Sequence, residues 1–121
     1  MTVDPTHNLP GQIIAVLDEL ETATHDYGVA LRKSNASEAD YRLAFAGAAI
    51  KLADGAVGKM TVATREAHAL LQSRHEYQRW MIDSAVADSS RQLLYSLRAK
   101  LDALRTLNAN VRALTDPRLP S

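Results

Sequence analysis

The chain has 121 residues, no cysteine, and 14 basic against 14 acidic side chains. This length predicts one domain, residues 1–121, and the absence of cysteine excludes disulfides, thiolate zinc sites and a cysteine nucleophile. A net charge of zero makes nucleic acid a less favoured partner than protein, because nonspecific nucleic-acid binding depends on excess positive charge.

The first predicted element is a helix over residues 11–54, after an irregular lead-in that contains Pro5 and Pro10. Mostly apolar or small positions alternate by four and three residues in this range, with the charged Glu38 among them: Ile13, Leu17, Leu20, Thr24, Tyr27, Leu31, Ser34, Glu38, Tyr41, Phe45, Ala48 and Leu52. This repeat predicts a helix that buries one face against another helix.

The middle of this helix, SNASEAD at residues 34–40, has the composition of a loop. The repeat passes through it without a change of phase, which favours one continuous helix. The alternative is a break at Ser34–Ser37, with Ser37 capping a new helix.

A turn is predicted at residues 55–60, where Gly55 and Gly58 follow the last apolar position. Because this turn is short, the next helix must run back antiparallel. Its N-cap is expected at Thr61, with Thr64 as the alternative.

The second predicted helix covers residues 62–114 without proline or glycine, and a short tail, 115–121, follows it. In its first half the apolar face is predicted at Ala67, Leu71, Gln78, Ile82, Val86 and Leu93. In its second half a leucine seam begins at Leu94 and continues through Leu97, Leu101, Leu104, Asn108 and Val111. The sequence thus predicts an all-α, coiled-coil-like antiparallel helical hairpin.

The end of the leucine seam predicts self-association. Residue 114 would lie opposite the very start of the chain, so Leu104, Asn108 and Val111 extend past their intramolecular partner and need cover from a second subunit or another protein. If Asn108 is buried, it fixes register or oligomeric state; the alternative is a solvated helix end.

Arginines recur every seven residues beside this seam, at Arg91, Arg98, Arg105 and Arg112. Such a ladder selects helix partners and their orientation, and is expected to lie broadly opposite the acidic residues at 18–26. The alternative is that it contacts the phosphates of single-stranded nucleic acid.

A second candidate contact is an aromatic and basic patch that consists of Tyr77, Trp80 and Met81 with Arg74 and Arg79. It could stack bases or hold a partner peptide. The favoured explanation is that Trp80 and Tyr77 pack across the hairpin against Tyr41, Tyr27 or Leu31.

No catalytic, metal or cofactor site is predicted. HEYQR at residues 75–79 has Arg79 where a zinc helix needs its second histidine, and GAVGK at 55–59 lacks the spacing of a phosphate-binding loop. No apolar run reaches the length of a membrane span, and the N-terminus has no signal-peptide pattern.

Two stretches carry a family resemblance: GKMTVATRE at residues 58–66 and LRAKLDALRTLNANVRA at 97–113. Across residues 40–114 the chain resembles small all-helical proteins of actinobacterial tailed phages and prophages, with departures at Met60 and Thr64. The resemblance implies a protein of the host cytoplasm whose gene lies near recombination and single-strand-binding functions. It carries no activity and no catalytic residues.

Together these observations predict a non-enzymatic phage or prophage accessory protein that acts through helix packing as a homo-oligomer or on a phage or host protein. The alternative function is a recombination or replication accessory protein that binds single-stranded nucleic acid through the arginine ladder.

Overall fold

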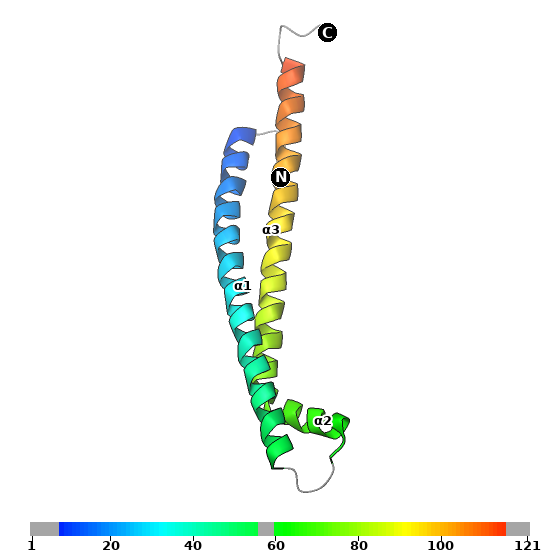
Figure 1. The fold of residues 1–121 in the computed structure, drawn as a ribbon. Coiled ribbons are helices and arrows are strands. Elements are labelled where there is room, and N and C mark those ends of the chain that lie inside the picture. Colours follow the sequence, from blue (N-terminus) through cyan, green and yellow to red (C-terminus); the bar gives the residue numbers. More distant parts are fainter. Residues whose placement is uncertain (1–7, 56–59, 116–121) are drawn as a thin grey trace, which may run out of the picture. The chain divides into compact units, whose positions relative to one another are not determined.

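The computed structural model describes residues 8–55 and 60–115. It contains α1 (Leu9–Asp54), α2 (Val62–Gln72) and α3 (Arg74–Thr115), and the described residues contain no strand (Figure 1). The long helices α1 and α3 pack against each other as a hairpin. The predicted all-α antiparallel hairpin is therefore confirmed.

The contacts of the chain fall into two compact units. Unit 1 is Met1–Tyr27 with Ser90–Ser121, and unit 2 is Gly28–Ser89. Each unit contains a stretch of α1 and an antiparallel stretch of α3, and unit 2 also contains α2. The packed interface between α1 and α3 is thus described in two parts, one in each unit.

The polar middle of α1 is helical, so the single-helix prediction is confirmed and the break at Ser34–Ser37 is not found. Ser34 and Ser37 are both buried, at 7% and 5% exposure. The Ser37 hydroxyl donates a hydrogen bond to the Asp83 carboxylate of α3. These serines are therefore part of the helix interface, where short side chains let two helices approach closely.

The buried face of α1 lies one residue away from part of the predicted face. Buried positions include Val16, Ala23, Ala30 and Ser37, each next to a predicted position. The predicted Leu17 and Leu31 are 42% and 40% exposed. The repeat of three and four was right, but small residues occupy half of the seam and displace the larger leucines to its edge.

The buried face of α3 follows one continuous repeat. Its buried residues are Asp83, Ala87, Leu94, Leu97 and Leu101, at spacings of three, four and seven. The apolar face predicted for the first half of this helix is wrong, because Ile82, Val86 and Leu93 are 64%, 53% and 55% exposed. The leucine seam extends backward through small and polar residues, with no change of phase.

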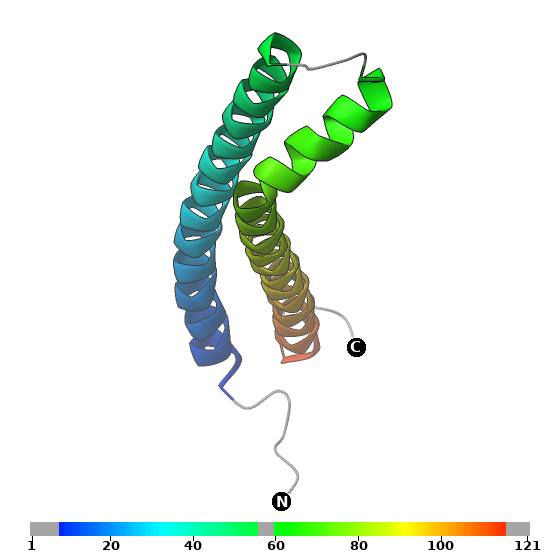
Figure 2. The ribbon, with the colours of Figure 1, turned by 90° about the horizontal axis from the view of Figure 1, so that it is seen from below.

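The second predicted helix is divided at Ser73. Ser73 is fully buried with φ −101° and ψ 19°, and its hydroxyl donates to the Ala69 carbonyl at 2.7 Å. A serine hydroxyl that bonds to the carbonyl four residues earlier competes with the helix and bends it. Figures 1 and 2 show α2 (bright green) at an angle to the start of α3. The predicted continuous helix over residues 62–114 is therefore wrong, because the helix is divided at Ser73.

Thr61 caps α2, as predicted. Its backbone is extended, with φ −68° and ψ 156°, and its hydroxyl accepts a hydrogen bond from the Thr64 backbone N–H at 3.2 Å. Residues 56–59 of the predicted turn lie outside the described residues.

The bend at Ser73 has no space for a larger side chain, since Ser73 is 0% exposed. We expect Ser73→Leu to lower the free energy of unfolding by about 1–3 kcal/mol, the usual cost of overpacking. The matched change at an exposed serine, Ser89→Leu, should alter it by less than about 0.5 kcal/mol. Urea unfolding of both variants at one protein concentration measures the difference. Equal effects would contradict the tight packing of this bend.

Candidate interaction surfaces

The core of unit 1 forms where the leucine seam meets small residues of α1. Ala23, Leu94 and Leu97 are buried together, and Leu20 and Tyr27 pack against them. Leu101 is also buried, at 6% exposure. This part of the predicted partner seam is used within the hairpin itself.

The remaining predicted seam residues, Leu104, Asn108 and Val111, are half-buried. Within unit 1, α3 continues beyond the first turn of α1 (Figure 1). Leu114, near the end of α3, is 86% exposed. Asn108 thus lies near a helix end that the described part of α1 covers incompletely, and its predicted role in oligomer register stays a prediction.

The arginine ladder is exposed along its whole length, at Arg91, Arg98, Arg105 and Arg112. Within the described residues, no ion pair joins Arg98, Arg105 or Arg112 to a carboxylate. The predicted pairing of these three arginines with the acidic residues of α1 is therefore not formed. Exposed pairs of this kind stabilise a fold by only about 0–1 kcal/mol, so the hairpin does not depend on them.

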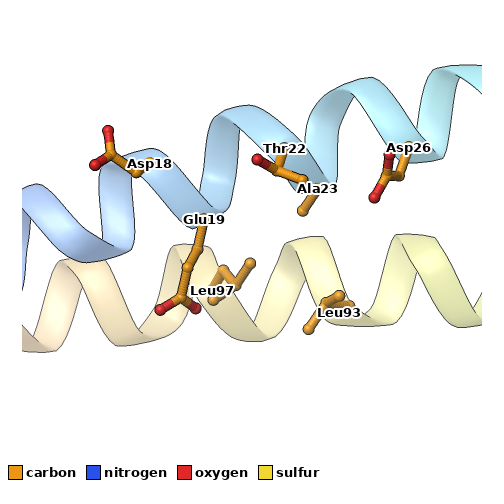
Figure 3. Close-up of a pocket in the computed structure, with 7 residues that line it drawn as sticks. All are labelled: Asp18, Glu19, Thr22, Ala23, Asp26, Leu93 and Leu97. Atoms are coloured by element: carbon orange, nitrogen blue, oxygen red, sulfur yellow. The ribbon is translucent and has the colours of Figure 1, made fainter.

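An apolar groove with an acidic rim lies in unit 1 between α1 and α3 (Figure 3). Its volume is about 380 Å³. Four polar side chains line the α1 side of this groove, Asp18, Glu19, Thr22 and Asp26, and its apolar residues are Ala23 on α1 and Leu93 and Leu97 on α3. The seam prediction did not include this groove, because its floor depends on Ala23 being buried and Leu93 being exposed.

An aromatic cluster joins α1 to α3 in unit 2. The ring of Tyr41 stacks on Trp80 at a centroid distance of 5.4 Å and meets Tyr77 edge-on at 5.3 Å. Phe45 lies 6.0 Å from Tyr41. The favoured explanation, that Trp80 and Tyr77 pack across the hairpin, is confirmed, and of the three partners considered the rings contact Tyr41. Arg79, between them in sequence, is exposed.

A buried polar network lies in the same unit. Asp83 is 6% exposed and accepts a hydrogen bond from the Ser37 hydroxyl. The ammonium group of Lys33 lies 3.8 Å from the other carboxylate oxygen, on a side chain that is 71% exposed. Sequence reasoning missed this network, although extending the leucine repeat backward from Leu94 places Asp83 on the seam.

The described residues contain no group of three or more His, Cys, Asp or Glu side chains that could hold a metal ion. His68 and His75, seven residues apart in sequence, lie on different helices, α2 and α3. None of the described helices has the length and apolar character needed to span a bilayer.

Comparison of the chain with protein-family models, curated proteins and solved structures gives no match. The function is therefore inferred from the surfaces of the two units.

Proposed function

We propose that this chain is a non-enzymatic accessory protein that acts by packing its helices against other protein chains, including a second copy of itself. The observation that carries this proposal is a set of large apolar side chains outside the hairpin seam. In unit 2, Val29 on α1 is 46% exposed, and Ile82 and Val86 on α3 are 64% and 53% exposed. Ile82 and Val86 are four residues apart on α3 and so lie on one face of that helix, and exposed apolar side chains on one face are typical of protein interaction surfaces.

The family resemblance indicates where this protein would act and which class of partner it would bind. A protein made from a phage or prophage gene acts in the cytoplasm of its bacterial host, so its partner is another phage protein or a host protein. The two resembling stretches include Leu97 and Leu101 of the seam and Arg98 and Arg105 of the ladder.

A second candidate function is binding of single-stranded nucleic acid. Its support is the exposure of Arg98, Arg105 and Arg112, which have no carboxylate partner among the described residues. Two observations favour protein packing instead. The net charge is zero, and one face of the Trp80 ring is already stacked on Tyr41.

Light scattering tests the proposal, with and without a short single-stranded oligonucleotide at low and near-physiological salt. We expect a mass of at least a dimer that the oligonucleotide does not change. Ile82→Glu with Val86→Glu should raise the dissociation constant of the oligomer at least about tenfold, since two charges would enter an apolar contact. The control, Asn35→Glu with Gln78→Glu, adds the same charge at exposed polar positions.

Two results would count against helix packing. A mass equal to one chain at every concentration would contradict self-association. Co-elution with the oligonucleotide that weakens as salt rises, and that Arg98→Glu with Arg105→Glu abolishes, would make nucleic-acid binding the better function.

A further inference from the structure

We propose that the acid-rimmed groove of unit 1 binds a basic amphipathic helix of a partner protein. This inference rests on the proposed function, because it names the class of partner for one surface. Helices that dock into grooves present apolar side chains at spacings of three and four residues, with polar side chains at the margins.

The floor of the groove provides the apolar half of this recognition. Leu93 is 55% exposed although it lies beside the buried Leu97 and Ala23. Figure 3 shows Ala23 projecting from α1 toward α3 and Leu97 projecting from α3 toward α1, with Leu93 one turn along α3 from Leu97. Covering an exposed leucine releases water from its surface and favours association by about 25 cal/mol per Å² of apolar area.

The rim provides the charge. Asp18, Glu19 and Asp26 are exposed carboxylates, and none of them forms an ion pair within the described residues. Three carboxylates along one side of an apolar depression repel one another and repel an acidic partner. Lysine or arginine side chains on a docking helix would relieve this repulsion, and this complementarity selects a basic partner.

The length of the rim matches a helix. Asp18 and Asp26 are eight residues apart on α1, which corresponds to about 12 Å along the axis, or about two turns. A partner helix can place apolar side chains on successive turns over the floor while its basic side chains reach the rim.

A second copy of this chain is a weaker candidate for the same groove. Its regular row of exposed basic residues is the arginine ladder on α3, and seating that ladder in the groove of a neighbour joins two different surfaces. Such a contact is head-to-tail and produces open-ended assemblies unless it closes into a ring. A separate basic helix occupies the groove without this consequence.

Fluorescence anisotropy with the full chain tests the inference. The probe is a labelled peptide of about 18 residues, long enough to form a helix, with leucine at helical spacing and lysine elsewhere. One control peptide has glutamate in place of lysine, and a second has alanine in place of leucine. We expect binding of the leucine–lysine peptide that is at least about tenfold tighter than binding of either control.

Matched variants locate the binding site. Asp18→Asn, Glu19→Gln and Asp26→Asn together should weaken the peptide about tenfold, from the loss of three charge pairs. The control, Glu21→Gln, Asp40→Asn and Asp102→Asn, removes the same charge from exposed positions outside the groove and should change binding less than about twofold. Leu93→Ser should weaken binding, whereas Leu43→Ser, at a side chain that is 73% exposed, should not.

Equal weakening by the two triple variants would overturn the groove assignment, since total charge would then explain the binding. Equal binding of the leucine and alanine peptides would overturn it as well. If the rim variant instead lowers the solution mass of the protein, a second copy is the occupant and the partner helix is wrong. If only the peptide result fails and the mass remains oligomeric, helix packing stands without this groove.

Discussion

Replacing Trp80 with alanine should lower the free energy of unfolding by about 3 kcal/mol, the largest single-residue effect that we expect in unit 2. Trp80 stacks on Tyr41 at 5.4 Å and meets Tyr77 edge-on at 6.2 Å. Removing a large aromatic side chain from a packed site costs about 3–5 kcal/mol, and ring pairs add about 0.5–1.5 kcal/mol. Trp80 is half-buried, so the lower end of that range applies.

Urea unfolding at one protein concentration measures this effect, with Tyr95→Ala as the control. Tyr95 is 56% exposed, and its loss should cost less than about 0.5 kcal/mol. Because Trp80 is the single tryptophan of the chain, its fluorescence gives a second reading. Tyr41→Leu should shift the emission to longer wavelength by admitting water to the indole ring. Equal costs for Trp80→Ala and Tyr95→Ala, with unchanged emission in Tyr41→Leu, would contradict the stacked arrangement.

The sequence predicted the parts of this fold that depend on repeat length. Leucines at spacings of three and four can be buried on only one face of a helix, so Leu94, Leu97 and Leu101 were placed correctly. The cap at Thr61 also followed from local chemistry, because a threonine hydroxyl satisfies an amide that the first turn leaves unpaired.

The face of α1 was harder to predict, because two adjacent stripes of that helix compete for the seam. One stripe contains Leu17 and Leu31, and the other contains Ala23 and Ala30. Hydrophobicity alone favours the leucines. Close packing favours the alanine stripe, as where Ala23 is buried with Leu94 and Leu97, since one large side chain fills the space above one small side chain. This choice depends on the partner helix, which a single-helix pattern does not include.

The same limit applies to the surfaces. The groove requires Ala23 on the seam and Leu93 at its edge, so it followed from neither helix alone. At the bend, the Ser73 hydroxyl bonds to a carbonyl of its own helix, but the Thr24 hydroxyl makes the same bond inside the continuous α1. Sequence alone therefore does not show which hydroxyl accompanies a bend.

The second large effect that we expect concerns the buried carboxylate of Asp83. Ser37→Ala should lower the free energy of unfolding by about 1.5–3 kcal/mol, the usual contribution of a hydrogen bond to a charged group. The hydroxyl of Ser37 is the partner that lies inside the interface, because Lys33 is mostly exposed and 3.8 Å away. Without this hydroxyl, the Asp83 carboxylate is still buried, and the exposed Lys33 ammonium at 3.8 Å is the group that remains to stabilise its charge.

Replacing both partners should have the opposite effect. Ser37→Ala with Asp83→Leu removes the buried charge together with its donor, and such exchanges are often neutral or stabilising by about 1–4 kcal/mol. We therefore expect the double variant to unfold at a urea concentration equal to or above that of the wild type, while Ser37→Ala alone unfolds well below it. Ser84→Ala, at a half-buried serine beside Asp83 in sequence, is the control for loss of a hydroxyl.

The double variant also tests why a charge lies on this seam. A polar pair that must align across two helices can fix their register, since sliding one helix by a turn would leave the carboxylate without its donor. If Asp83 has this role, the double variant should be stable, but its aromatic side chains should adopt more than one packing arrangement. The near-ultraviolet circular dichroism of Trp80 would then be weaker. The contrary result is a double variant with a lower free energy of unfolding than Ser37→Ala. It would show that the Asp83 carboxylate stabilises the fold even without its Ser37 donor, and this would contradict a role of Asp83 in register alone.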